Sequence, residues 1–303
     1  MICKIYCLDI LKFLKLLLEE YGEKIAMVII ADPPYNIRKD SWDWREKYLE
    51  WCAEWIKLME RLLKSNGSFY LFHNQFRRLR DIDLWIEKNT HLDLKQEIIW
   101  NKFFKGCKNY DYLTTHLQIK SLKNYQKMAE YVLFYQFDNS YKLIEKREEL
   151  GLDQLTISQE IKSKNDNLTG WYSNIEKGKN YATRDTIKPI EKHLGLTYND
   201  IVPYFKSIWN KNFYNNSVWN YDIPKKVEHI TPKPINLIKN ILAHSSKKDD
   251  LIINLFSGSG NVEIACLESG RDVLGCDNNP MYVKTAQNKL KLLKYVYGNG
   301  GRK

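Results

Sequence analysis

A short apolar run followed by an acid, two prolines and an aromatic residue constrains this chain more than any other stretch. Residues 25–31 read Ile-Ala-Met-Val-Ile-Ile-Ala, which is typical of a fully buried strand. Asp32, Pro33, Pro34 and Tyr35 follow at once, where an α/β sheet places its ligands. The prolines stiffen the turn, so a carboxylate and an aromatic ring lie at a rigid rim. This rim suits a flat substrate with an amino group, although four residues also fit an ordinary proline-rich turn.

The order of the elements predicts an α/β fold. Predicted strands at 2–8, 25–31, 68–72 and 94–100 alternate with predicted helices at 10–21, 44–64 and 77–88. Such alternation is the signature of a doubly wound, mainly parallel sheet with helices on both faces. We expect Asn66 and Gly67 to end the long helix at 44–64. The 303 residues allow one large domain with an insertion, or two domains.

The charge of the chain fits a polyanionic partner. There are 47 Lys and Arg against 37 Asp and Glu, a formal net charge of +10. Lysines interleaved with aromatic residues between 102 and 127, including Lys102 and Lys105, fit either a solvated face or contacts with DNA. Six scattered cysteines without a CxxC pair suggest neither a metal site nor disulfides, and favour a cytoplasmic setting. We expect no signal peptide and no membrane span.

Residues 141–204 interrupt the alternation, after one more predicted strand at 130–137. The predicted elements are short helices, at 142–150, 156–162, 168–177, 185–194 and 198–202. On the stretches 147–152, 157–161, 171–179 and 190–196 this segment resembles the helix-turn-helix domain of the phage-repressor type. The resemblance implies that the helix at 168–177 enters the major groove, with Thr169, Trp171, Tyr172 and Asn174 facing bases or phosphates. The alternative is a helical insert that packs against the protein and contacts no DNA.

A glycine-rich turn near the end of the chain predicts a cofactor site. The apolar strand at 251–255 runs into Phe256, Ser257, Gly258, Ser259, Gly260 and Asn261, and a helix follows. Glycines let the backbone approach a ligand, and the helix N-terminus supplies free N–H groups. A later strand ends in Asp277, about 20 residues on, where a carboxylate can accept hydrogen bonds from ribose hydroxyls. Together these features predict a nucleoside-containing cofactor. The missing third glycine disfavours a nicotinamide-dependent dehydrogenase.

Thr231-Pro232-Lys233-Pro234 lies between the helical segment and the glycine-rich turn. It precedes a predicted helix at 235–244, with Thr231 as the expected N-cap. The separate motifs now resemble, in order, the permuted β class of DNA amino-methyltransferases that use S-adenosylmethionine. The resemblance covers about 1–104 and 225–303, and it implies a Rossmann-like methyltransferase fold. It divides the chain into a catalytic half at 1–104, a target-recognition insertion at 105–224 with the helix-turn-helix at about 141–204, and a cofactor-binding half at 225–303.

The resemblance also implies roles for the matched residues. Asp9 would bind the adenine amine of the cofactor, Thr231 and Lys233 its methionine carboxylate, and Asp277 its ribose. The implied cofactor-binding set is Asp9, Asp32, Thr231, Lys233, Asn254, Phe256, Ser257, Gly258, Gly260, Asn261 and Asp277. Asn254 departs from the family, which usually has Asp there. The change removes a negative charge that could face the sulfonium or the amino group.

The implied reaction is methyl transfer to the amine of a base taken out of the DNA stack. Tyr35 would stack on the base, while the Asp32 carboxylate and the Pro33 carbonyl accept the amine hydrogens. Asp32, Pro33, Pro34 and Tyr35 are therefore the implied catalytic residues. An acid at the first position favours N6 of adenine over N4 of cytosine, and both remain open. A DNA-binding regulator with an inactive methyltransferase fold is the alternative from another class. A homodimer and a separate cognate restriction endonuclease are further expectations.

Overall fold

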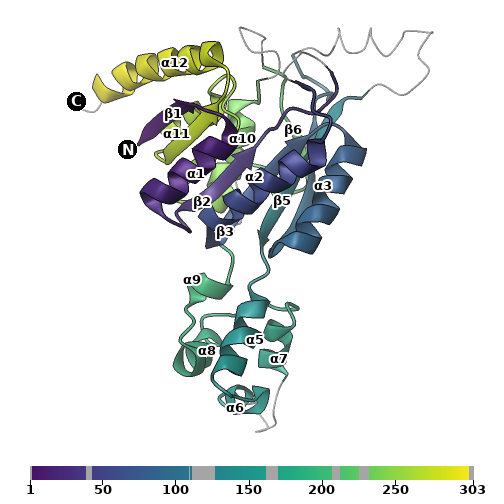
Figure 1. The fold of residues 1–303 in the computed structure, drawn as a ribbon, viewed down its shortest axis with the longest axis vertical. Coiled ribbons are helices and arrows are strands. Elements are labelled where there is room, and N and C mark those ends of the chain that lie inside the picture. The colour runs from purple at the N-terminus through teal and green to yellow at the C-terminus, as the bar shows by residue number, and fades with distance from the viewer. Residues whose placement is uncertain are drawn as a thin grey trace.

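The computed structural model describes residues 2–38, 43–108, 110, 127–161, 170–206, 212–224 and 232–299, and it contains one large sheet with helices on both faces (Figure 1). The strands are β1 (Cys3–Cys7), β2 (Ala26–Ala31), β3 (Leu63–His73), β4 (Leu92–Asn101), β5 (Ala129–Phe137), β6 (Val218–Asn220), β7 (Leu251–Asn254) and β8 (Asp272–Asp277). The helices are α1 (Ile10–Tyr21), α2 (Tyr48–Leu62), α3 (Phe76–Asn89), α5 (Ser140–Glu149), α6 (Gln154–Ser158), α7 (Trp171–Glu176), α8 (Ile187–Leu194), α9 (Tyr198–Ile201), α10 (Ile235–Ser245), α11 (Asn261–Glu268) and α12 (Pro280–Asn299).

The strand order is β1-β8-β7-β2-β3-β5-β4-β6. Strand β5 is antiparallel to both of its neighbours, and the other pairs are parallel. The predicted doubly wound, mainly parallel sheet is therefore confirmed. Among the helices of the described residues, none combines the length and the apolar character that crossing a membrane requires.

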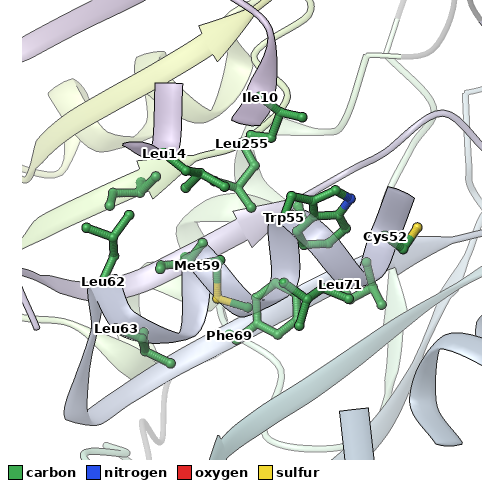
Figure 2. Close-up of a cluster of buried hydrophobic side chains, with 14 of the residues drawn as sticks. Ile10, Leu14, Cys52, Trp55, Met59, Leu62, Leu63, Phe69, Leu71 and Leu255 are labelled. Carbon is green, nitrogen blue, oxygen red and sulfur yellow. The ribbon is translucent and has the colours of Figure 1, made fainter. Parts of the chain in front are cut away.

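Helices α1, α2 and α3 cover one face of the sheet, and α10 and α11 cover the other. Helix α2 buries Cys52, Trp55, Met59 and Leu62, the helical spacing of a single apolar stripe. Figure 2 shows this stripe against Phe69 and neighbouring side chains of the sheet. Burial of these large side chains supplies the main driving force for packing the layer, at about 25 cal/mol per Å² of apolar surface.

Two local predictions are wrong. Helix α2 ends at Leu62 and β3 begins at the next residue, so Gly67 lies inside a strand rather than at a helix end. The register between β2 and β3 shifts here, and a Cβ on Gly67 would lie 2.8 Å from the Leu63 side chain. The glycine therefore permits a bulge in the strand. Pro234, and not the predicted Thr231, is the N-cap of helix α10, and Thr231 lies outside the described residues.

The stretch 105–224 is not a separate insertion throughout. Strands β5 and β6 both lie within it, and both pair with β4 in the central sheet. Strand β6 was not predicted because three residues are too few to show a periodic pattern. What stands apart from the sheet is a smaller unit, the helical lobe, which consists of α5 to α9 (Figure 1).

The helical lobe has its own apolar core, to which Leu143, Ile157, Tyr172 and Ile190 contribute. A buried ion pair ties its first three helices together. Arg147 Nε of α5 donates to Glu176 Oε1 of α7 over 2.6 Å, and Gln154 of α6 also donates to the Glu176 carboxylate. The lobe is therefore an internally packed unit rather than a set of helices lying on the sheet.

Both connections to the lobe meet the sheet at the beginning of β3. Asn139 Nδ2 donates to the Ser65 carbonyl over 2.7 Å, and the Tyr204 amide donates to the Asn66 carbonyl over 2.9 Å. Asp32 follows the end of β2, which is parallel to β3. Asp32 therefore lies at the opposite end of these strands from the connections to the lobe. The stretch of β3 from Ser65 to its end at His73 spans roughly 26 Å at about 3.3 Å per residue.

Candidate active site

The connections of the sheet reverse direction between the neighbouring strands β2 and β7. From β2 the chain passes through α2 to β3 on one side, and from β7 through α11 to β8 on the other. In open α/β sheets the crevice at such a switch point is where ligands bind. Ile30 of β2 pairs with Asn254 of β7, so the Asp-Pro-Pro-Tyr turn and the glycine-rich turn open onto this crevice together.

A cavity of about 330 Å³ lies at the switch point. This volume is within the range of small-molecule sites. Most of the predicted catalytic and cofactor residues line it, namely Asp9, Asp32, Pro33, Pro34, Tyr35, Lys233, Asn254, Phe256, Ser257, Gly258, Asn261 and Asp277. Two stretches that lie more than 200 residues apart in the chain therefore share one site. Gly260 is not among the lining residues, although its neighbours Ser259 and Asn261 are. Thr231 is outside the described residues.

Four buried or half-buried charges form a cluster at one wall of the cavity. Lys233 Nζ lies 2.6 Å from Asp32 Oδ2 and 3.6 Å from Glu130 Oε2. Lys102 Nζ makes an ion pair with Glu130 Oε1, and only 18% of its side chain is exposed. Two carboxylates and two ammonium groups are thus matched in a largely buried site. Because buried ions need such partners, the cluster fixes the Asp32 carboxylate in one orientation.

The charges of this cluster support one another. Burial alone would raise the pKa of Glu130, but Lys233 and Lys102 outweigh it and lower that pKa to about 2. Burial alone would lower the pKa of Lys233, but the two carboxylates outweigh it and raise that pKa. Glu130 is therefore ionised and Lys233 is a cation at neutral pH. Glu130 was missed by the sequence reasoning because it begins an apolar strand far from either motif.

Tyr35 forms a fixed wall of the cavity. Its hydroxyl donates to Asp32 Oδ1 over 2.6 Å and lies 3.1 Å from Glu130 Oε2. Burial and the two carboxylates raise the pKa of Tyr35 well above its ordinary value, so the hydroxyl keeps its proton. The ring lies 4.8 Å from the His73 ring between centroids, and 9% of the residue is exposed. The aromatic face is thus held in place by hydrogen bonds at its far end.

A chain of hydrogen bonds from His73 through Tyr48 holds the backbone of the proline turn. The Tyr48 hydroxyl donates to the Pro34 carbonyl over 2.7 Å and lies 3.2 Å from His73 Nε2. Burial lowers the pKa of His73 to about 3, so the ring is neutral, and Nδ1 accepts from the Gln75 amide. The proton is therefore assigned to Nε2, which donates to Tyr48. No described residue donates to the Pro33 carbonyl, which leaves an acceptor at the rim.

The glycine-rich turn is shaped by close packing and by Asp277. Gly260 has φ +79°, and a Cβ there would lie 2.8 Å from the Ala286 Cβ, so only glycine fits without movement. Asp277 accepts hydrogen bonds from the amides of Gly258 and Asn279 over 2.8 and 2.9 Å. Asp9 caps α1 by accepting from the Leu11 amide over 2.9 Å. Both carboxylates line the cavity and still have lone pairs for a ligand.

Asn254 has an unforeseen partner in Glu263 of α11. Asn254 Nδ2 and Ser257 Oγ both donate to Glu263 Oε1, over 2.9 and 2.6 Å. Gly275 of β8 leaves the space, since a Cβ there would lie 2.2 Å from Glu263 Oε1. Burial raises the pKa of Glu263. Asn254 lines the cavity, and its Oδ1 is buried without a partner among the described residues. This oxygen is therefore an unused hydrogen-bond acceptor.

The predicted DNA-binding residues do not lie together. Lys102 points into the charge cluster instead of lying on an open lysine surface, whereas Lys105 is exposed. Trp171 and Asn174 belong to the helical lobe, which joins the sheet at the end of the strands away from the cavity. Tyr172 is fully buried in the core of the lobe, so the prediction that its side chain faces DNA is wrong. Thr169 lies outside the described residues.

Comparison with known proteins places the chain in a family. The profile of the DNA methylase family that is labelled N6 and N4 matches residues 26–288, so the chain belongs to this family. The chain is 26% identical over 283 residues to the type II methyltransferase M1.MboII of Moraxella bovis, covering 91% of this chain and 94% of that protein. It is 24% identical over 282 residues to the DNA adenine methyltransferase YhdJ of Escherichia coli K12, covering 88% of this chain and 77% of that protein.

The fold is also that of solved relatives. The crystal structure of an M1.HpyAVI–SAM complex superposes with a TM-score of 0.56 and 19% identity, covering 95% of this chain and 100% of that chain. At this identity the likeness establishes the shared fold. It agrees with the eight-stranded sheet of this protein.

Replacing Glu130 by Gln tests the charge cluster through stability. The Glu130 pKa falls from an ordinary 4.5 to about 2 on folding, so its contribution is present above pH 4.5 and is lost as the pH falls towards 2. The shift corresponds to about 3 kcal/mol. We expect Glu130→Gln to lower the free energy of unfolding at pH 7, measured by urea titration. Between pH 4.5 and 2 the free energy of unfolding of this variant should decline less than that of the native protein. Glu87→Gln, on the exposed face of α3, is the control. Equal pH profiles for Glu130→Gln and the native protein would contradict the cluster.

Replacing Asn254 by Asp tests the Asn254–Glu263 pair. The change puts a second carboxylate within hydrogen-bond distance of Glu263, so one of them must take up a proton or lose its partner. We expect the free energy of unfolding at pH 7 to fall by about 1–3 kcal/mol. The double variant Asn254→Asp/Glu263→Gln reverses the donor and acceptor and should recover most of the loss. If the single variant unfolds like the native protein, Glu263 does not orient Asn254.

Proposed function

We propose that this protein transfers a methyl group from S-adenosylmethionine to the N6 amine of adenine in DNA. One observation carries the proposal: the Asp-Pro-Pro-Tyr turn and the glycine-rich turn line the same cavity at the switch point of the sheet. A rigid aromatic wall and hydrogen-bond acceptors face a site fit for a nucleoside-containing ligand. The membership of the chain in the DNA methylase family supports the same reaction.

The residues of the cavity fit the cofactor. The turn of Gly258 and Gly260 brings backbone close to a ligand, and Asp277 and Asp9 present fixed carboxylates for hydroxyl and amine donors. The unpartnered Asn254 Oδ1 is suited to accept from an ammonium group. When bound, S-adenosylmethionine supplies an electrophilic methyl group. Phe256, Ser257, Asn261 and Thr231 keep their predicted roles in this proposal.

Lys233 has a further role beside the cofactor contact that the motif implies. Its ammonium group is bound to Asp32 and lies near Glu130, which makes it an orienting partner of the catalytic carboxylate. A carboxylate has about four lone-pair sites, so Asp32 can hold Lys233 and Tyr35 and still accept from a substrate amine. We propose that Lys233 positions Asp32 in addition to any contact with the cofactor.

The target base would occupy the space beside Tyr35. The ring supplies a flat face, and hydrogen bonds at its far end prevent it from turning away. Asp32 and the Pro33 carbonyl would accept the two hydrogens of the amine, which directs the nitrogen lone pair towards the glycine-rich side of the cavity. The residues accelerate the reaction by positioning and by excluding water, and no cysteine nucleophile is needed.

Adenine is favoured over cytosine on two grounds. The motif begins with Asp32, and the relative YhdJ is named a DNA adenine methyltransferase. The family label includes N4 enzymes as well, so an N4-cytosine product is the second candidate. We further propose a cytoplasmic location, with the helical lobe contacting DNA. A homodimer and a separately acting restriction endonuclease remain predictions.

The test of this function is a product analysis. Purified protein is incubated with labelled S-adenosylmethionine and unmethylated genomic DNA, and the digested nucleosides are separated. We expect label in N6-methyladenine. Label in N4-methylcytosine would retain the mechanism and change the base. The absence of label, with DNA binding intact, would contradict the enzymatic proposal and favour a DNA-binding regulator.

Asp32→Ala tests the catalytic role directly. Loss of the acceptor should lower methyl transfer more than about 100-fold, the effect of removing one well-placed transition-state contact. Cofactor binding, measured by calorimetry, should fall much less than turnover, because the variant removes the partner of Lys233 but leaves the glycine-rich turn intact. Asp32→Asn keeps one acceptor oxygen and is expected to retain intermediate activity. Unchanged turnover in Asp32→Ala would contradict the mechanism.

A further inference from the structure

The helical lobe presents an ordered, exposed and positively charged loop, the cationic loop, at residues 177–184. Lys177, Lys179 and Arg184 are exposed in it, and Tyr181 is 53% exposed. None of these three cations forms an ion pair with a described residue. The lobe from 140 to 202 has as many acidic as basic residues, so the positive charge is a local feature of this loop.

The backbone of the cationic loop is fixed. The amides of Lys179 and Asn180 both donate to the Asn174 carbonyl, over 2.9 and 3.2 Å, and Gly178 adopts φ +67°. Ala182 is buried in the lobe core and anchors the middle of the loop. Cations and an aromatic ring held on a fixed backbone form a surface that suits a phosphate backbone, because little ordering is required on binding.

The cationic loop lies nearer to the start of β4 than to the end of that strand, which leads to the cavity. Tyr181 is close to Lys95 in the first half of β4, with the Lys95 Nζ 5.7 Å from the ring centroid. The lobe joins the sheet at Ser65 and Asn66, whereas the cavity follows the other end of the same strands. Along β4, seven residue steps separate Lys95 from Lys102, which lines the cavity. At about 3.3 Å per residue this is roughly 23 Å, or about seven base pairs of duplex at about 3.4 Å each.

We propose that the cationic loop is a second DNA-contacting surface, which binds the duplex away from the base held in the cavity. This inference rests on the proposed function, because it takes the partner to be the DNA that the cavity modifies. The lobe then adds affinity for long DNA and does not contact the modified base or its immediate neighbours. A duplex of about one turn can fill the cavity but cannot reach the loop at the same time.

The test compares two duplexes centred on a base that the protein methylates, one of about 12 and one of about 40 base pairs. Methylation of the short duplex by the native protein is measured first, so that failure of the proposed function is recognised separately. The variant is Lys177→Ala/Lys179→Ala/Arg184→Ala, with circular dichroism as the check on folding. The control is Lys12→Ala/Lys15→Ala/Lys284→Ala, which removes three exposed lysines from α1 and α12.

Binding is followed by fluorescence anisotropy as a function of salt. On the long duplex we expect the slope of log K against log salt to become less negative by up to about 2.7, the value for three phosphate contacts. On the short duplex the slope and the methylation rate should remain as in the native protein. The control should change neither slope. Equal losses on both duplexes would mean that the lobe contacts DNA beside the target base and would overturn the proposal. No loss on either duplex would overturn it too, and would favour a protein partner or a second copy of the chain.

Discussion

The ion pair between Asp32 and Lys233 is the contact on which the site depends. It joins a turn near the beginning of the chain to the segment before α10, more than 200 residues later, across a distance of 2.6 Å. Glu130 and Lys102 complete the charge balance. The Tyr35 hydroxyl donates to Asp32 and also lies close to Glu130. Taking four charges out of water is unfavourable unless each has a partner, so the cluster stabilises only one arrangement of β2, β5 and the α10 entry. That arrangement is the one that forms the cavity.

The cavity and the helical lobe lie at opposite ends of the strands of the sheet. Everything that could handle a base or a cofactor follows the carboxyl ends of the parallel strands, at the switch point between β2 and β7. The helical lobe leaves and rejoins the sheet at the beginning of β3, the other end of the same strands. The antiparallel direction of β5 causes this, because a strand that begins beside the cavity must end at the far edge. In this position the lobe, which we propose contacts DNA, would do so away from the cavity.

Sequence reasoning predicted most of what depends on local pattern. The apolar runs of β2, β7 and β8 and the turns that follow them were found because buried parallel strands have a strong signal and carry their ligands at one end. Glu130 and Glu263 were missed, since their importance comes from which strands and helices become neighbours. Lys102 was assigned to a surface because an ion pair with a residue 28 positions away leaves no mark in the sequence. Tyr172 lies at the centre of the lobe, where one face of a six-residue helix cannot be distinguished from another by periodicity.

The central claim is that Asp32 and Lys233 act as one unit that holds the two parts of the site together. A double-mutant cycle with Asp32→Asn and Lys233→Met, measured by urea unfolding at pH 7, tests it most directly. We predict that the two single variants lose stability and that the double variant loses markedly less than their sum, with a coupling free energy of about 1–3 kcal/mol. Strictly additive losses would show that the two charges do not support each other, and would contradict the role of this ion pair as the link between the two parts of the site.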